Sequence, residues 1–258
     1  ASLIVLSEMP RALPEALLEG MEWDSANLKY ETLSDLHAYS ARVASAVGVM
    51  MCVLMNVRDK DVLARACDLG AAMQLTNIAR DIGEDARNGR LYIPLRWMAE
   101  EGLDINRFLN NPEPGKRVGR IAKRLLAEAE RLYSRAEAGL SELPFSCRPG
   151  IFAARHIYEQ IGKHIAAADY DSITKRAFTT KMEKLSFLLL SVANSATVSL
   201  MPRSAIVHAE PLEEMRFLIN ATSVYQSNKG LIDRKAGAVM NILEQMERRD
   251  RRYQTVLE

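Results

Sequence analysis

The sequence of 258 residues predicts an all-α protein. Its composition is 48% hydrophobic but only 6% aromatic, with Ala, Leu, Met, Glu and Arg in place of the β-branched and aromatic runs that strands prefer. Apolar residues recur at helical spacing over long segments, and neither a strand pattern nor an internal repeat interrupts them. Because a chain of this length can bury a full core, a fold built only from helices is expected.

Balanced charge and few cysteines exclude several classes of protein. The 34 basic and 33 acidic residues leave a net charge of +1, so no global field draws the chain to nucleic acid. The three cysteines, Cys52, Cys67 and Cys147, are an odd number without CxxC spacing, which argues against a disulfide framework and a zinc site. The chain is therefore expected in a reducing cytoplasm.

The first helices are predicted from proline, capping residues and apolar spacing. Pro14 suits the first turn of a short helix that runs toward Gly20. Thr32 and Asp35 resemble a capping box, which predicts a long helix over 33–56. Its apolar positions follow at helical spacing: Leu36, Tyr39, Val43, Val47, Met50 and Leu54.

The same helix carries a cluster of small residues, Ala44, Ser45, Ala46 and Gly48. Such a cluster either lets another helix approach closely or leaves room for a ligand. A second long helix is predicted over 60–87, because Asn88 and Gly89 have the usual chemistry of a C-terminal cap. The segment 91–94 is then extended, since Pro94 biases the residue before it away from helix.

Further helices are expected at about 116–141, 149–169, 181–200, 211–222 and 232–252, separated by prolines. The uncharged segment 185–201 is short for a membrane span and contains several polar residues, so it predicts a buried helix with one face able to touch lipid. From Ile206 onward the chain is polar and ends in a charged run, ERRDRRYQ. We therefore divide the sequence into a helical domain, 1–205, and a C-terminal helical extension, 206–258, packed on it or partly exposed.

A row of amides and carboxylates marks the end of the helix over 60–87. At about 100° per residue, Gln74, Asn77, Asp81 and Asp85 fall within roughly 80° of one another, and apolar residues flank them. To a cation, these carboxylate and amide side chains offer only oxygen atoms as ligands. Mg²⁺ takes oxygen ligands, whereas zinc usually binds His or Cys. The two aspartates lie where the helix macrodipole disfavours anions, so something positive should offset them.

The chemistry of these residues leaves two interpretations open. Arg80, Arg87 and Arg90 could offset the aspartates and make this a solvated, salt-bridged helix end. Alternatively the row, which we call the polar stripe, is a cation-binding face. The two amides on the same stripe favour the second interpretation without deciding it.

Longer strings in the sequence resemble a known family. QLTNIARDIGEDARNGRLYIP, residues 74–94, resembles the second aspartate-rich motif of the squalene and phytoene synthases and is most similar to that of bacterial phytoene synthases. YETLSDLHAYSARVASAVG, residues 30–48, resembles a substrate-facing helix of the same family. IYEQIGKHI and DYDSITKRA, residues 157–165 and 169–177, resemble its later helices, so the likeness covers nearly the whole chain.

The resemblance implies a fold, a reaction and a set of cofactors. The fold is the all-α isoprenoid-synthase (class I terpenoid synthase) fold, with helices around a central cavity. The reaction is the head-to-head condensation of two geranylgeranyl diphosphates to phytoene through a cyclopropyl (prephytoene) diphosphate, in carotenoid biosynthesis. Mg²⁺ or Mn²⁺ holds the diphosphates, and no NADPH is needed, in contrast to squalene synthase. Greasy substrates with charged heads imply a cytoplasmic protein that is peripheral on the inner face of the membrane.

The resemblance also assigns roles to individual residues. Asp81 and Asp85 match metal-binding aspartates, with Asn77 and Gln74 as companions, and Arg80 matches an arginine that pairs with diphosphate. Tyr39 matches a tyrosine that steadies carbocations and assists proton loss. Tyr158, Lys175 and Arg176 match groups that contact diphosphate. The residues expected to line the prenyl chain are Val43, Ala46, Val47 and Met50, although core packing and satisfied surface charges would explain several of these positions equally well.

The sequence departs from the family pattern in two places. Ser45 stands where the family often has glycine, and the first aspartate-rich motif, which precedes the matched region, is not found. The nearest acidic cluster, 21–24, lacks the DxxxD form. We therefore expect an N-terminally incomplete fold that binds Mg²⁺ and diphosphate weakly and turns over poorly by itself. A squalene or dehydrosqualene synthase, or a non-catalytic scaffold of the same fold, remains the alternative.

Overall fold

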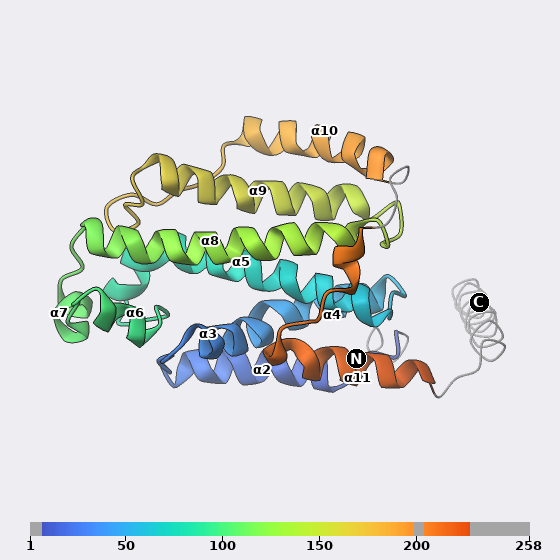
Figure 1. Ribbon diagram of the computed structural model, residues 1–258, viewed down its shortest axis with the longest axis horizontal. Coiled ribbons are helices and arrows are strands. Elements are labelled where there is room, and N and C mark those ends of the chain that lie inside the picture. The colour runs from blue at the N-terminus through green and yellow to red at the C-terminus, as the bar shows by residue number, and fades with distance from the viewer. Residues whose placement is uncertain (1–6, 199–203, 228–258) are drawn as a thin grey trace, which may run out of the picture. The chain divides into compact units, whose positions relative to one another are not determined.

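The computed structural model describes residues 7–198 and 204–227, and these ranges contain helices and connecting segments without any strand (Figure 1). The predicted all-α fold is therefore confirmed for this part of the chain, while the helix expected at 232–252 lies outside it. In chain order the elements are α2 (Ala12–Ser25), α3 (Leu33–Ser40), the π-helical η1 (Ala41–Ser45), α4 (Ala46–Leu54), α5 (Lys60–Arg87), α6 (Leu95–Glu100), α7 (Ile105–Asn110), α8 (Lys116–Leu140), α9 (Arg148–Ala167), α10 (Lys181–Val198), the 3₁₀ turns η2 (Ala205–His208) and η3 (Glu213–Met215), and α11 (Arg216–Ser227).

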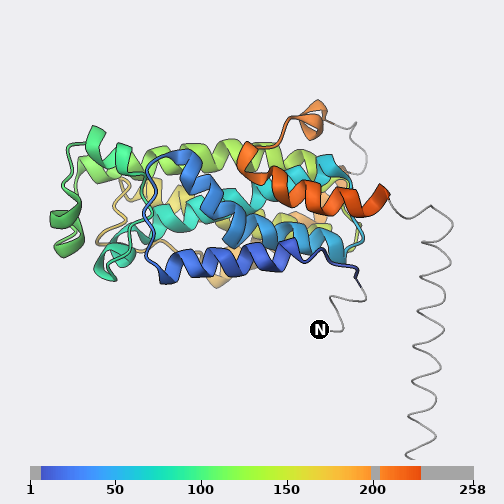
Figure 2. The same ribbon diagram turned by 90° about the horizontal axis from the view of Figure 1, so that it is seen from below.

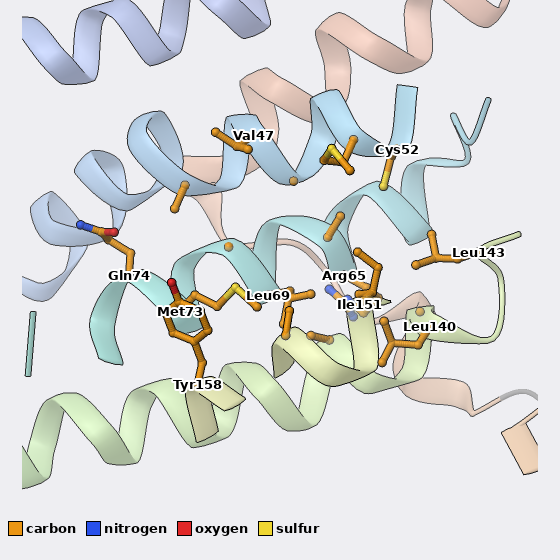
Figure 3. Close-up of a pocket in the computed structure, with 18 of the residues that line it drawn as sticks. Val47, Cys52, Arg65, Leu69, Met73, Gln74, Leu140, Leu143, Ile151 and Tyr158 are labelled. Atoms are coloured by element: carbon orange, nitrogen blue, oxygen red, sulfur yellow. The ribbon is translucent and has the colours of Figure 1, made fainter. Parts of the chain in front are cut away.

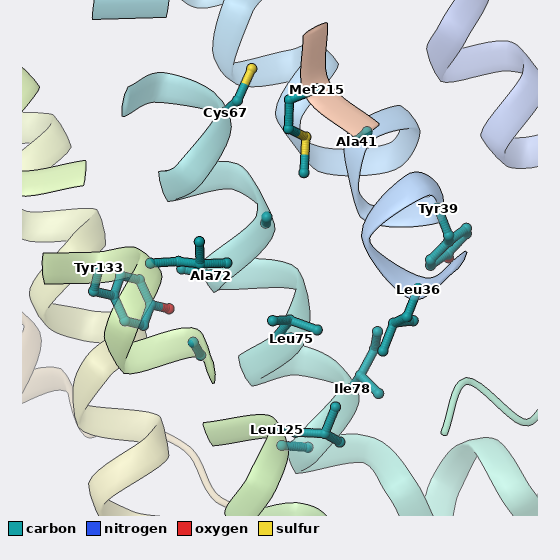
Figure 4. Packing of buried hydrophobic residues seen from close by; sticks show 14 of the residues in the cluster. Leu36, Tyr39, Ala41, Cys67, Ala72, Leu75, Ile78, Leu125, Tyr133 and Met215 are labelled. Carbon is teal, nitrogen blue, oxygen red and sulfur yellow. The ribbon is translucent and has the colours of Figure 1, made fainter. Parts of the chain in front are cut away.

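Helix α5 is the central element, and it begins and ends where its caps predict. Asp59 accepts hydrogen bonds from the first backbone amides, and Gly89 follows the last turn at a φ of 72°, a conformation that glycine adopts without strain. One side of α5 packs along α8, and other sides contact α4 and α9 (Figures 1 and 2). Fully buried side chains such as Leu75 and Leu125 fill the interface (Figure 4).

The long helix predicted over 33–56 contains an irregularity that the apolar spacing does not reveal. Thr32 and Asp35 form the expected capping box. In η1, however, the amide of Ala46 donates to the carbonyl of Ala41, and the wider turn rotates the residues that follow. Val49 and Val53 are consequently buried, whereas Val47 and Leu54, expected on the buried stripe, are 40% and 42% exposed.

The small residues of η1 and α4 serve both purposes that their size allows. Gly70 of α5 lies so close to the backbone of Ala44 and Ser45 that an added Cβ would sit 2.8 Å from them. The Ser45 hydroxyl donates to the Cys67 carbonyl at 2.8 Å, which satisfies a serine that is fully buried. Ala44 and Gly48 also border a cavity, described below.

The helix Leu33–Leu54 is long and apolar enough to cross a membrane, but 56% of its most apolar 18-residue segment is buried. Because it packs against α2 and α5, we assign it to the core of the fold. Helix α10 was predicted to be a buried helix, and this prediction is wrong because most of its large apolar side chains are exposed. Ser191 and Ser195 are its fully buried residues, while Leu185 and Leu189 are 52% and 67% exposed.

The part of the extension nearest the domain packs on it through the buried Arg65 and the half-buried Arg135. Arg65 donates to the carbonyls of Ile206 and Ala209, and Arg135 donates to that of Glu210. Met215 is fully buried in the core. The first compact unit therefore extends past Ile206, where the character of the sequence changes, as far as Thr222.

Candidate functional site

An apolar cavity of about 320 Å³ opens between η1–α4, α5, α9 and the end of α8 (Figure 3). Gln74 and Tyr158 lie at one end, and Cys52, Leu140 and Leu143 lie at the other. The lining is therefore mostly apolar, with Gln74, Asn77 and Tyr158 at one end and Arg65 toward the other. Such a space suits a ligand with a long apolar chain and a polar head.

The residues expected to line a prenyl chain are only partly brought together. Val43 and Val47 border the cavity. Ala46 and Met50 do not: Ala46 is fully buried and Met50 packs against the core, so their predicted positions are corrected. The wide turn of η1 accounts for the difference, because it turns Met51 and Gly48 toward the space instead.

The polar stripe lies beside this cavity, and all four members are half-buried. Gln74 and Asn77 line the cavity, whereas Asp81 and Asp85 continue the stripe along α5 beyond it. Ala71, Leu75, Ile78 and Ile82 are buried beside them, as the helical spacing predicts. A solvated helix end would expose these side chains, so the stripe borders the interior.

Asp81 is held by two arginines. Arg80 donates to its Oδ1 at 2.8 Å, and Arg176 donates to the same oxygen at 2.9 Å. Burial alone would raise the pKa of Asp81, but these hydrogen bonds outweigh it and lower the pKa below its usual range. Arg80 and Arg176 are thus the positive charges expected to offset the aspartates at the unfavourable end of the helix macrodipole. Arg80 forms its ion pair with Asp81 and not with Glu84, which lies one helical turn further on.

Arg176 reaches the stripe because α5 has a glycine where the later segment crosses it. A Cβ on Gly83 would lie 2.7 Å from the Cα of Ile173, and the Gly83 amide donates to the Ser172 carbonyl at 3.0 Å. Lys175 and Arg176 both border a smaller cavity of about 140 Å³ together with Arg80, Glu84 and Arg87, but of these two only Arg176 donates a hydrogen bond to Asp81. Of the two neighbouring cations predicted to contact diphosphate, Arg176 is therefore the one that contacts the stripe.

Asp85 carries negative charge that its surroundings disfavour. Burial raises its pKa to about 7, the charges of Asp81, Glu84 and Asp24 add to the effect, and Arg90 offsets part of it. A carboxylate with such a pKa gains most from a bound cation. The Oδ1 atom of Asn77 is also buried without a hydrogen-bond partner, which is a cost unless a ligand satisfies it.

These groups fit a divalent cation that shares its coordination with a substrate. Among residues 7–198 and 204–227, no group of three or more His, Cys, Asp or Glu side chains could hold a metal ion by itself. Mg²⁺ is commonly held by one or two carboxylates together with substrate phosphates. Asp81, Asp85 and the unpartnered oxygen of Asn77 supply the protein's share of that arrangement.

Tyr39 lies outside the cavity lining. It is 3% exposed, and its hydroxyl donates to the carboxylate of Asp24, which also accepts a hydrogen bond from Tyr92. Neither Asp24 nor Tyr92 follows from the helical spacing of the stripe, because Asp24 is far from it along the chain and Tyr92 lies beyond the end of α5. The available signal was the acidic cluster 21–24, which lacks the spacing of a metal motif.

Comparisons with known proteins agree on one family. The squalene/phytoene synthase family model matches residues 1–183. A phytoene synthase of Cereibacter sphaeroides is 53% identical over 97% of this chain and 70% of its own length, and one of Rhodobacter capsulatus is 51% identical over 97% and 73%. A crystal structure of a dehydrosqualene synthase in complex with ligand matches with a TM-score of 0.64 at 28% identity, covering 72% of this chain and 65% of that one. A squalene synthase from Alicyclobacillus acidocaldarius, at 22% identity and a TM-score of 0.61, supports the fold.

Replacing Asp85 with Asn should stabilise the metal-free protein at pH 8. The ionised carboxylate is disfavoured in the folded state, because its pKa is raised to about 7. Removing its charge should therefore raise Tm by about 2–4 °C, the shift that about 1 kcal/mol produces in a domain of this size after screening is allowed for. The gain should shrink as pH falls from 7 toward 4, since the folded wild type then keeps its proton. Differential scanning fluorimetry measures it, with Glu130→Gln as an exposed control, and a lower Tm for Asp85→Asn at pH 8 would contradict the assignment.

Proposed function

The chain belongs to the squalene/phytoene synthase family, and on that premise we propose that it is a phytoene synthase. The reaction joins two geranylgeranyl diphosphates head to head, through a cyclopropyl diphosphate, and releases both diphosphates. One observation carries the proposal: the polar stripe, with two arginines bound to Asp81, adjoins the end of the apolar cavity where Gln74 and Tyr158 lie. That combination matches a substrate with a diphosphate head and a long hydrocarbon chain.

The cavity supplies binding energy for the hydrocarbon chain. Each methylene that leaves water contributes about 0.8 kcal/mol, so a chain lying between Val43, Val47 and the side chains of α8 and α9 is strongly retained. Tyr158 lines the same end of the cavity as Gln74, and we propose that it contacts the first carbons or the diphosphate. The cavity thereby orients the head of the substrate toward the stripe.

The stripe acts on the diphosphate. Asp81, Asp85 and Asn77 would hold Mg²⁺, or Mn²⁺, against the diphosphate oxygens. When bound there, such a cation would supply neutralisation of the charge that develops on the departing diphosphate. Arg80 and Arg176, which pair with Asp81 in the free protein, have guanidinium groups that can pair with phosphate oxygens in two places. Binding of substrate would therefore exchange an internal ion pair for one with the ligand.

A squalene or dehydrosqualene synthase is the second candidate, because the dehydrosqualene synthase structure shares the fold at 28% identity. The two candidates differ in the length of the prenyl substrate and, for squalene, in the need for a reductant. Product mass separates them without reference to the fold. A scaffold without catalysis would have no use for the buried, unpartnered oxygen of Asn77.

Incubation with geranylgeranyl diphosphate and Mg²⁺, without a nicotinamide, should yield a C40 hydrocarbon, detectable by mass spectrometry, at the low rate expected in the absence of the first aspartate-rich motif. Asp81→Asn should lower the rate by about 100- to 1,000-fold, the loss expected when one electrostatic contact to a departing group is removed. Glu130→Gln serves as the surface control. A C30 product from farnesyl diphosphate in preference to C40 would favour the second candidate, and a fully active Asp81→Asn would exclude the stripe from the reaction.

We further propose that the protein acts at the cytoplasmic face of a membrane and contacts lipid through α10. Exposed apolar side chains extend along α10 and begin at Phe178, just before the helix. The others are Met182, Leu185, Leu188, Leu189, Leu190 and Val192. Lys181 and Lys184 are exposed on the same helix, which suits acidic lipid headgroups. A C40 hydrocarbon product is insoluble in water, so a lipid phase beside the enzyme receives it.

Vesicles of phosphatidylcholine and phosphatidylglycerol test this surface by co-flotation. The double variant Met182→Glu/Leu189→Glu removes two of the most exposed apolar side chains, 75% and 67% exposed, and should weaken binding by on the order of 10-fold or more. Leu18→Glu, an apolar position 64% exposed on α2, makes the same chemical change elsewhere and should bind as the wild type does. No flotation of the wild type, or equal flotation of the double variant, would contradict lipid contact through α10.

A further inference from the structure

The smaller cavity of about 140 Å³ lies where the segment 172–176 crosses α5. We call it the basic cavity, after the charged side chains that border it: Arg80, Glu84, Arg87, Lys175 and Arg176. At about 100° per residue, its α5 positions lie roughly 100° around the helix from the polar stripe. Within the described part of the chain, no residue borders both this cavity and the apolar one. The basic cavity is therefore a separate space beside the candidate site.

The charges around the basic cavity do not cancel. Arg176 pairs with Asp81 at 2.9 Å and with Glu84 at 3.1 Å. These two carboxylates face the four cationic side chains that border the cavity, so two positive charges remain in excess. Arg87 and Lys175 account for the excess, because neither forms an ion pair within residues 7–198 and 204–227. Uncompensated cations repel one another, so an anion bound between them would stabilise the folded protein.

Hydrogen bonds hold the segment 172–176 in place over the cavity. Arg87 donates to the Ile173 carbonyl at 3.2 Å, which fixes its guanidinium at the wall. Asp171 accepts hydrogen bonds from the amides of Ile173 and Thr174 at 3.0 and 2.9 Å. That carboxylate therefore shapes the turn of the segment, and the cavity is formed before any ligand arrives.

An unsatisfied hydroxyl belongs to the same wall. Ser172 borders the basic cavity and is 4% exposed, and its Oγ atom is buried without a hydrogen-bond partner among the described residues. Such a group costs free energy unless a ligand or a water molecule satisfies it. The neighbouring hydroxyl of Thr174 differs, because it donates to Asp171. Ser172 thus has a donor to offer to an anion.

These groups suit a phosphate group better than other ligands. A guanidinium such as that of Arg87 can pair with phosphate oxygens in two places, and the ammonium of Lys175 adds a point charge. Phosphate and diphosphate carry two or more negative charges, which match the excess of two positive charges. A hydrocarbon chain does not suit this cavity, because charged side chains form most of its wall.

We infer that the basic cavity is a second anion site, which binds a phosphate group separately from the diphosphate site proposed at the stripe. The ligand is either free inorganic phosphate or diphosphate, or the phosphate of an acidic lipid, since the segment leads directly to Phe178 and the exposed apolar face of α10. Because Arg176 borders the cavity and pairs with Asp81, an anion bound here competes with Asp81 for that arginine. The binding itself does not depend on the proposed reaction.

Calorimetric titration with sodium diphosphate in EDTA, without any divalent cation, tests the inference. The wild type should bind, with an affinity that falls as NaCl is raised. Arg87→Gln should weaken binding about 10-fold or more, the loss expected when a hydrogen bond between charged groups is removed. Arg87→Lys keeps the charge and should lose less. Arg11→Gln, which removes a 90% exposed charge at the start of α2, should bind as the wild type does.

Three further variants locate the anion and guard against a loss of folding. Ser172→Ala should weaken binding about 2- to 10-fold, yet its Tm without anion should equal or exceed that of the wild type, because the hydroxyl it removes is unsatisfied. Asn77→Ala, on the stripe, should leave binding unchanged. Asp81→Asn should tighten binding, because it releases Arg176, although the same change should slow the proposed reaction. The inference and the proposed function can therefore fail separately.

Flotation with phosphatidylglycerol vesicles distinguishes the two sources of phosphate. Weaker flotation of Arg87→Gln than of Arg11→Gln would identify a lipid phosphate as the ligand, and equal flotation would identify the free anion. No binding of diphosphate by the wild type at low salt would overturn the inference. Unchanged affinity in both Arg87→Gln and Ser172→Ala would also overturn it, and so would an equal loss in Asn77→Ala, which would place the anion on the stripe.

Discussion

The concentration of negative charge at the carboxyl end of α5 is the constraint on which the rest of the site depends. Asp81 and Asp85 lie where the helix macrodipole is unfavourable and where burial removes much of the water that would stabilise them. Folding leaves them only partly compensated: Asp81 has Arg80 and Arg176, while Asp85 remains difficult to ionise. The protein thus retains an attraction for a cation in the folded state.

The surrounding elements make sense as supports for this helix end. Gly83 lets residues 172–176 cross α5 closely enough for Arg176 to reach Asp81. Gly70 lets η1 and α4 approach the other side of α5, and the same small residues leave space for the cavity. Near the start of α5, Arg65 and Arg135 hold residues 206–210 by hydrogen bonds to their backbone carbonyls. The close backbone contacts at Gly70 and Gly83 therefore fix the position of the polar stripe next to the apolar cavity.

The sequence predicts those features whose causes are local. The end of α5 follows from Asn88 and Gly89, and the stripe follows from helical spacing alone. The extra residue per turn in η1 could not be predicted, because a π turn depends on how α3 and α4 pack against α5. It is the reason why Met50 faces the core while Met51 lines the cavity. Asp24 escaped prediction for a similar reason, since its partners are 15 and 68 residues away in the chain. In α10, apolar content suggested burial, but the sides of the helix are assigned by contact with α9, which buries Ser191 and Ser195 instead.

We expect the stripe on α5 to hold a divalent cation against a diphosphate. Crystals grown with Mn²⁺ and a non-hydrolysable geranylgeranyl thiolodiphosphate would show this, because anomalous scattering locates manganese independently of the chemistry. We expect a manganese peak bounded by Asp81, Asp85 and the Oδ1 atom of Asn77, the prenyl chain in the adjoining cavity, and Arg176 on the diphosphate. A diphosphate bound away from α5, or manganese absent from the stripe while Arg176 still pairs with Asp81, would contradict it.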